Sequence, residues 1–216
     1  MNVSRFRLLM LALSVISLGI IFGTLLWLKL PARTGFGEWN GTIEGLGEYG
    51  TVPDFSLIER TGRRVSLKDL RGKVWIADFI YTTCKDTCPM QSAEMSKLQD
   101  AWSDRSQLQF VSFSVDPDHD TPEVLTEYAR NFRADGNRWL FLTGDKAQIS
   151  GLVQDGFRLS AAPVTESGSE DSVILHSPRF VLIDKAAQIR GYYDSREQDA
   201  LARLKKDVLT LISAKE

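Results

Sequence analysis

The feature that most constrains this chain is an apolar run, residues 73–81, that leads directly to its only two cysteines. The run reads KVWIADFIY; Cys84 and Cys88 follow it, and Pro89 comes directly after the second cysteine. A short, strongly apolar run favours a buried central strand over a helix. Proline is well suited to the first turn of a helix. The sequence therefore predicts a strand, a loop that holds both cysteines, and then a helix.

Strands and helices are predicted to alternate along the rest of the chain. The predicted strands are 108–115, 139–142, 180–183 and 188–193, and the predicted helices are 89–102, one that starts near Pro122, 145–154, and a last one with Leu201, Leu204, Val208, Leu211 and Ile212 on one face. A polar stretch, 161–172, predicts a mobile loop. The alternation implies an α/β fold with helices on both sides of a sheet.

Composition limits the class of protein. The chain has 216 residues, of which 43% are hydrophobic, enough for one domain with a full core and an appendage. A net charge of −2 gives no electrostatic case for binding nucleic acid. Two cysteines do not form a multi-disulfide scaffold, so packing must stabilise the fold.

The appendage is a predicted membrane anchor at the N-terminus. Residues 8–28 contain no charged side chain, and at about 1.5 Å per residue a helix of this length crosses roughly 30 Å of hydrocarbon. A cleaved signal peptide is the alternative, but the residues after Trp27 offer no small-residue cleavage site. The sequence thus predicts a tail at 1–7, one transmembrane helix at 8–28, a linker at 29–50 and the main domain at 51–216. The short N-terminus favours an orientation that leaves the main domain on the far side of the membrane. No Arg- and Ser-rich presequence precedes the span, which favours a bacterial inner-membrane protein whose domain faces the periplasm.

A lone cysteine pair at this position is either a soft-metal chelate or a redox couple. We expect Cys88 to be the N-cap of the following helix, because the residue before a proline is displaced from helical geometry. The positive end of the helix dipole would then lower the pKa of Cys88. Cys84 is expected in the loop just before it, at the C-terminal end of a strand, where open α/β sheets place their sites.

Histidine is as scarce as cysteine, and the two histidines are His119 and His176. Two thiolates and the imidazole of His176 form a soft ligand set that suits Cu(I), and a further ligand or water would suit it to Cu(II). A structural zinc site fits less well because Zn²⁺ takes four ligands. His176 as an ordinary loop histidine stays open as an alternative. We expect His119, in a turn rich in aspartate, to be solvated.

Asp116 follows the strand after the one that leads to Cys84, so we expect it at the same edge of the sheet. There it would orient His176 or a ligand, or act as a further ligand. The alternative is that Asp116 and Asp120 cap the helix that starts near Pro122.

At these residues the sequence resembles the Sco/SenC family of copper proteins that serve cytochrome c oxidase assembly. The resemblance spans roughly residues 50–215. Its motifs are Tyr81-Thr-Thr-Cys84-Lys-Asp-Thr-Cys88-Pro89, Ser114-Val-Asp116-Pro-Asp-His-Asp120-Thr-Pro122, Phe141-Leu-Thr-Gly144, Leu175-His176-Ser177 and Phe180-Val-Leu-Ile-Asp184.

The resemblance implies a thioredoxin-like fold, with a mixed central sheet flanked by helices, on the outer face of the membrane. It assigns Cys84, Cys88 and His176 as ligands of copper, Cu(I) and Cu(II), and places Asp116 near the metal. The implied task is copper delivery to, or preparation of, the dinuclear copper centre of the cytochrome c oxidase subunit. Other copper chaperones are further partners that it suggests.

Two functions remain open. The first is a copper-binding assembly factor, a metallochaperone rather than an enzyme with turnover of its own. The second is a thiol–disulfide oxidoreductase that uses Cys84 and Cys88 as its redox pair and keeps the oxidase subunit's cysteines reduced. Pro178 slightly favours the second, because redox-active thioredoxin-like proteins have a cis-proline near this position.

Overall fold

The computed structural model of the chain describes residue 17 and residues 46–159 and 177–214. The chain divides into two units, Met1–Thr42 and Ile43–Glu216, and the fold given below is that of the second. Apart from Ser17, the predicted anchor at 8–28 lies outside the described residues. None of the helices within the described part of the chain has the length and hydropathy to span a bilayer.

A mixed sheet forms the centre of the second unit, in the strand order β2-β1-β5-β4-β3-β6-β7. Strands β3, β4 and β5 are parallel, whereas β1 and β6 run antiparallel to their neighbours in this group. This arrangement confirms the predicted mixed sheet. The strands are β1 (Ser56–Glu59), β2 (Arg64–Ser66), β3 (Val74–Ile80), β4 (Leu108–Ser114), β5 (Trp139–Thr143), β6 (Arg179–Ile183) and β7 (Ile189–Asp194).

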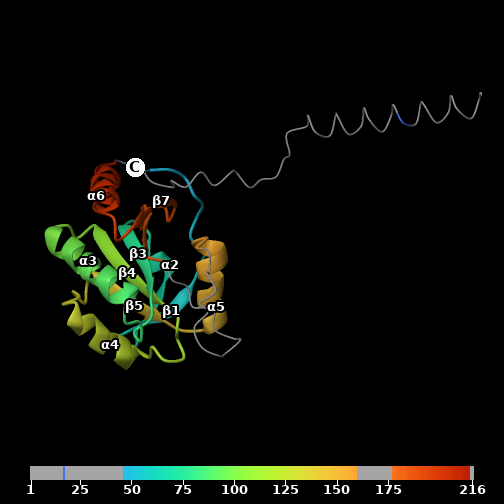
Figure 1. The fold of residues 1–216 in the computed structure, drawn as a ribbon, viewed down its shortest axis with the longest axis vertical. Coiled ribbons are helices and arrows are strands. Elements are labelled where there is room, and N and C mark those ends of the chain that lie inside the picture. Colours follow the sequence, from blue (N-terminus) through green and yellow to red (C-terminus); the bar gives the residue numbers. More distant parts are fainter. Residues whose placement is uncertain (1–16, 18–45, 160–176, 215–216) are drawn as a thin grey trace, which may run out of the picture. The chain divides into compact units, whose positions relative to one another are not determined.

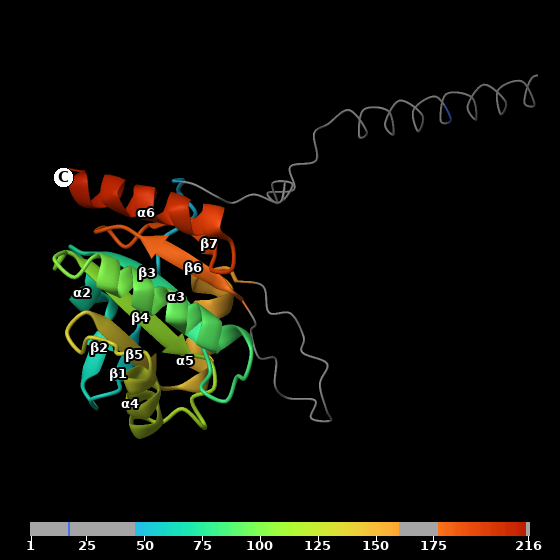
Figure 2. The same ribbon diagram turned by 60° about the vertical axis from the view of Figure 1, so that its left-hand side comes forward.

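Helices cover both faces of the sheet, as Figures 1 and 2 show for α3 and α4 on one side and α5 on the other. Every residue of β3 and β4 is buried, as expected of central strands covered twice. The helices are α2 (Leu67–Leu70), α3 (Thr87–Ala101), α4 (Pro122–Asn131), α5 (Lys146–Gly151) and α6 (Gln198–Ser213), and a π-helical turn, Leu152–Gly156, follows α5.

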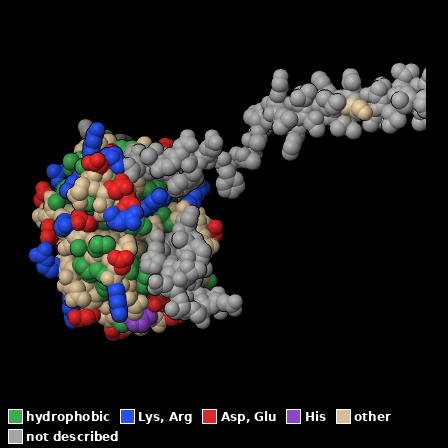
Figure 3. All heavy atoms as spheres, viewed as in Figure 1, with side chains coloured by type: hydrophobic (Ala, Val, Ile, Leu, Met, Phe, Trp, Pro, Cys, Tyr) green, Lys and Arg blue, Asp and Glu red, His purple; other side chains and the backbone are tan. Residues whose placement is uncertain are grey.

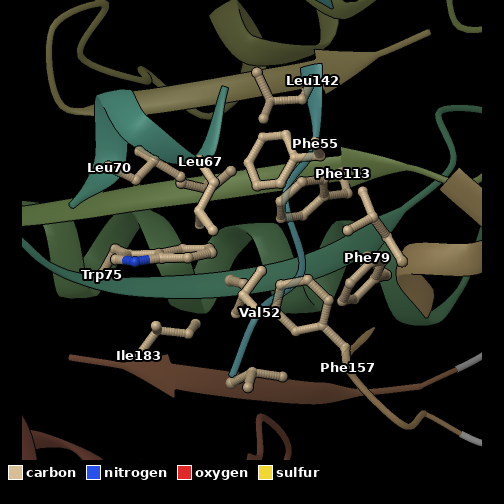
Figure 4. Packing of buried hydrophobic residues seen from close by; sticks show 14 of the residues in the cluster. Val52, Phe55, Leu67, Leu70, Trp75, Phe79, Phe113, Leu142, Phe157 and Ile183 are labelled. Carbon is tan, nitrogen blue, oxygen red and sulfur yellow. The ribbon is translucent and has the colours of Figure 1, made fainter. Parts of the chain in front are cut away.

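The two faces of the sheet bury separate hydrophobic clusters. Aromatic rings dominate the cluster on the α5 side (Figure 4), where Phe79 stacks on Phe113 at 5.3 Å and meets Phe157 edge-on at 5.0 Å. The cluster on the opposite face contains residues of α3, α4 and α6, and it also contains Cys84 and Cys88. The cysteines are therefore part of one of the two cores, at its border.

Most predicted elements are confirmed, with shifts of a few residues at their ends. The hairpin of β1 and β2 was not predicted as strands, although its turn at Thr61-Gly62 carries a turn signature, and α2 was missed because one helical turn has no periodicity to detect. The helix expected at 145–154 divides into α5 and the π-helical turn. The predicted loop at 161–172 lies outside the described residues.

Charged side chains of both signs are interspersed over the face shown in Figure 3. This distribution agrees with the small net charge of the chain. The described part of this face has no large area of one sign that would attract a polyanion.

Candidate metal and redox site

Three segments of the chain meet at one edge of the sheet. Because β3 and β4 are parallel, with Ile80 opposite Ser114, the loop after β3 and the turn after β4 leave the sheet at the same edge. Strand β6 runs antiparallel to β3, so its first residue, Arg179, lies at this edge as well. Figure 2 shows the start of β6 beside the N-terminal end of α3, and the side-chain amide of Gln91 in α3 donates a hydrogen bond to the carbonyl of Arg179 at 3.1 Å.

Both cysteines lie where the loop after β3 enters α3. They are free thiols and buried, with exposed fractions of 8% for Cys84 and 4% for Cys88. The backbone N–H of Cys88 donates a hydrogen bond to the Cys84 sulfur at 3.4 Å, and the N–H of Cys84 donates to the carbonyl of Tyr81 at 3.2 Å. The chain thus folds the sulfur of Cys84 back over the first turn of α3.

The prediction that Cys88 is the N-cap of the helix is wrong. Helix α3 begins at Thr87 with Asp86 as its N-cap, so Cys88 is the second helical residue. Pro89 is tolerated at the third position because the first N–H groups of a helix have no intrahelical partner. The helix therefore starts a little earlier than the proline suggests.

The prediction that the pKa of Cys88 is lowered is also wrong. Burial acts to raise the pKa of Cys84, but hydrogen bonds from the backbone N–H groups of Cys88 and Asp86 and from the Tyr81 side chain outweigh it, and the pKa is lowered. Burial raises the pKa of Cys88, and the negative charges of Cys84 and Asp78 add to this effect. The helix start thus favours the thiolate of Cys84, not that of Cys88.

A buried carboxyl group lies on the cysteine side of the sheet. Asp78 points to the same face as Ile76 and Ile80 because side chains alternate along β3. Its side chain is fully buried, and neither oxygen has a hydrogen-bond partner of good geometry among the described residues. Burial raises the pKa of Asp78 to about 7, although the Ser112 hydroxyl acts in the opposite direction. Sequence reasoning missed this residue; its signal was a single acidic residue within an apolar strand.

The turn after β4 holds Asp116 and Asp120 in different environments. Asp116 is half-buried at the edge of the sheet, as predicted, and its carbonyl accepts hydrogen bonds from the N–H groups of His119 and Asp120. Asp120 is fully buried and accepts hydrogen bonds from Thr82 and Ser114. Neither aspartate is the N-cap of α4, because Thr121 takes that role.

Of the two histidines, His119 is among the described residues. His119 is half exposed, and its Nδ1 lies 3.1 Å from an Asp120 oxygen and 3.3 Å from the Thr82 hydroxyl, so it is not simply solvated. His176 lies outside the described residues. Within the described ranges, no three side chains of His, Cys, Asp or Glu are grouped to hold a metal ion. The two sulfurs are thus the described part of the predicted ligand set.

The peptide bond before Pro178 is trans, as are all the peptide bonds of the described residues. The proline therefore gives no support to the redox alternative. The carbonyl of Pro178 accepts a hydrogen bond from the N–H of Ser195 at 2.7 Å, which fixes the chain just before β6.

The model of the SCO1/SenC family matches residues 44–212, which includes both cysteines and the whole sheet. The chain belongs to the SCO1/SenC family. One SCO1/SenC relative, the SCO1 protein homolog of Bacillus subtilis, is 33% identical over 159 residues, which cover 73% of this chain and 80% of the relative.

Solved structures of Sco proteins share the fold, which is thioredoxin-like. BsSco, described as a member of the Sco family of cytochrome c oxidase assembly proteins with a disulfide switch, is 29% identical with a TM-score of 0.66, over 80% of this chain and 99% of that one. ScoI of Bradyrhizobium japonicum, solved with copper bound, is 27% identical with a TM-score of 0.61, over 73% and 99% of the two chains.

Proposed function

We propose that this chain is a membrane-anchored copper-binding protein that assists assembly of the dinuclear copper centre of cytochrome c oxidase. The observation that carries the proposal is the pair of free sulfurs folded together at the start of α3, with the N–H of Cys88 on the sulfur of Cys84. Membership of the SCO1/SenC family supports it, as does a relative that was solved with copper bound.

The donor set fits copper better than a hard cation. Cys84 and Cys88 would hold the ion through sulfur, and soft thiolates select Cu(I). The lowered pKa of Cys84 supplies one thiolate readily. Bound copper would be the cargo that the chain carries to its acceptor.

His176 is the proposed third ligand. It precedes Arg179 by three residues, and three residues of extended chain span at most about 10 Å. Because β6 begins at the edge where the cysteines lie, this length of chain allows the imidazole to reach their sulfurs. We place Asp116 at the border of this site, where its carboxylate would orient His176 or join the metal.

A titration of the reduced chain with Cu(I) and with Cu(II) tests this function. Wild type should bind one copper, and His176→Ala should weaken Cu(II) binding more than Cu(I) binding, because imidazole adds most to the harder ion. His119→Ala is the matched comparison, and should change Cu(II) affinity less than His176→Ala does. Equal Cu(II) affinity in wild type and His176→Ala would remove His176 from the site.

A second candidate function is thiol–disulfide exchange with the cysteines of the oxidase subunit. The unequal thiols favour it, because a lowered pKa at Cys84 and a raised pKa at Cys88 suit an attacking thiolate and a second thiol that completes the reaction. The Cys84 thiolate would open an acceptor disulfide and form a mixed disulfide. Cys88 would then displace the acceptor thiol and close the Cys84–Cys88 bond. The test is whether the reduced chain reduces an oxidised acceptor peptide. If it does not, this activity is excluded.

We propose that residues 8–28 anchor the chain in the bacterial inner membrane, that 29–50 link it to the domain, and that the domain faces the periplasm. The uncharged run and the family membership support this location. The full chain should remain in the membrane fraction after alkaline carbonate washing, and external protease should reach the domain in spheroplasts. Release by the wash, or protection from protease, would contradict the proposal.

A further inference from the structure

We propose that Asp120 is a positioning residue of the site, a buried carboxylate that fixes the segment of chain carrying Cys84. The inference rests on the proposed copper-binding function. It differs from the sequence-based prediction, which placed the influential aspartate of this turn at Asp116.

The contacts of Asp120 join both strand ends at this edge of the sheet. Its carboxylate accepts from the Thr82 backbone N–H at 3.2 and 3.3 Å and also from the Thr82 hydroxyl. It accepts from the Ser114 hydroxyl at 2.6 Å. Thr82 follows β3, whereas Ser114 ends β4. One side chain therefore holds the exits of two parallel strands together.

The carboxyl group of Asp120 is buried and surrounded by hydrogen-bond donors. Asp120 is fully buried, and its carboxyl group accepts hydrogen bonds from the N–H and the hydroxyl of Thr82 and from the hydroxyl of Ser114. The ring of His119 lies on the same network, with Nδ1 at 3.1 Å from the carboxylate. Burying a polar group without hydrogen-bond partners is costly, so these donors are what allows the carboxyl group of Asp120 to be buried.

Asp120 is not required to start α4. Thr121 is the N-cap of that helix, and its side chain accepts from the N–H of Val124. A cap function, the alternative considered from the sequence, therefore does not account for the buried carboxylate.

Thr82 links Asp120 to the sulfur. It lies two residues before Cys84, inside the turn in which the N–H of Cys84 donates to the carbonyl of Tyr81. When Asp120 holds the N–H and hydroxyl of Thr82, the direction of this turn is fixed. The position of the Cys84 sulfur over the first turn of α3 then follows. Groups that orient metal ligands in this way commonly change metal affinity by about 10- to 100-fold.

The test measures Cu(I) affinity of the full-length chain, in detergent, by competition with a chromogenic Cu(I) chelator. Asp120→Asn should weaken binding about 10-fold and shift the thiolate-to-copper charge-transfer band of the Cu(II) form. Asp145→Asn is the control: Asp145 is the N-cap of α5, and its side chain accepts a hydrogen bond from the N–H of Gln148 in that helix. It should leave both readouts unchanged.

A second pair of variants keeps the test decisive where Asp120→Asn folds poorly. Thr82→Ser retains the hydroxyl that donates to Asp120 and should bind copper as wild type does. Thr82→Ala should bind more weakly than wild type, but less weakly than Asp120→Asn does, because its backbone N–H still donates to the carboxylate. The double variant Thr82→Ala, Asp120→Asn should be no weaker than Asp120→Asn alone if Asp120 acts through Thr82.

Equal affinity in Thr82→Ser, Thr82→Ala and wild type, or fully additive losses in the double variant, would overturn the inference. A wild-type chain that binds no copper would instead refute the proposed function, so the two failures are distinguishable.

Discussion

At the scale of single residues, the pKa values of two cysteines four positions apart are shifted in opposite directions. Hydrogen bonds from the N–H groups of Cys88 and Asp86 stabilise the Cys84 thiolate, whereas Cys88 is more deeply buried and faces the charges of Cys84 and Asp78. We therefore expect iodoacetamide to modify Cys84 before Cys88 in the reduced, copper-free chain. Trypsin cleaves after Lys85 and separates the two cysteines, so mass spectrometry can follow each one across a pH series. Modification of Cys88 at lower pH than Cys84 would contradict this order.

Asp78 should make the stability of the chain depend on pH. Its folded-state pKa of about 7 lies above the ordinary value of 3.8, so the folded state binds the proton more tightly than the unfolded state. The free energy of unfolding should thus fall as pH rises from about 4 to about 7, by roughly 2–3 kcal/mol between pH 5 and pH 8. Urea unfolding should show this loss in wild type and a flatter profile in Asp78→Asn. Identical profiles in the two proteins would refute the assignment.

At the scale of elements, α3 is attached by buried polar side chains as well as by apolar packing. Gln99 accepts from the N–H of Asp135 at 2.7 Å and donates to the carbonyl of Arg133 at 3.2 Å. Ser96 donates to the carbonyl of Phe132. These bonds satisfy backbone groups of the segment between α4 and β5, and they fix the helix that begins with the cysteines.

Gln99→Met should therefore lower the free energy of unfolding by roughly 2–4 kcal/mol, because it leaves two backbone groups without partners. Copper affinity should stay unchanged, since Gln99 lies eleven positions after Cys88 in the same helix, about 16 Å along its axis. Lys97→Met on the exposed side of the same helix is the matched control and should cost little. Denaturant titration measures both variants. A stability loss as large in Lys97→Met as in Gln99→Met would show that the buried hydrogen bonds are not the cause.

At the scale of the whole molecule, the sequence predicted the arrangement of the sheet better than the chemistry of its edge. The apolar run 73–81 and the segment 108–115 form the parallel strands β3 and β4. Short apolar runs bounded by polar turns favour buried strands, which is why both were predicted. The sequence also predicted that Cys84 and Asp116 would emerge at one edge.

The start of α3, the opposite pKa shifts of the two thiols and the central position of Asp120 could not be predicted. Each depends on which N–H or hydroxyl points at which atom, and this is determined by the packing of segments distant in sequence. Thr82 and Asp120, for example, are 38 residues apart.

The proposed function depends most on two sulfurs that bind one copper ion together. X-ray absorption at the copper K-edge of the Cu(I)-loaded full-length chain tests this directly. We predict two sulfur scatterers per copper in wild type and one in Cys88→Ser, with a nitrogen contribution that His176→Ala removes. A wild-type spectrum explained by nitrogen and oxygen scatterers alone would contradict copper binding by the two sulfurs.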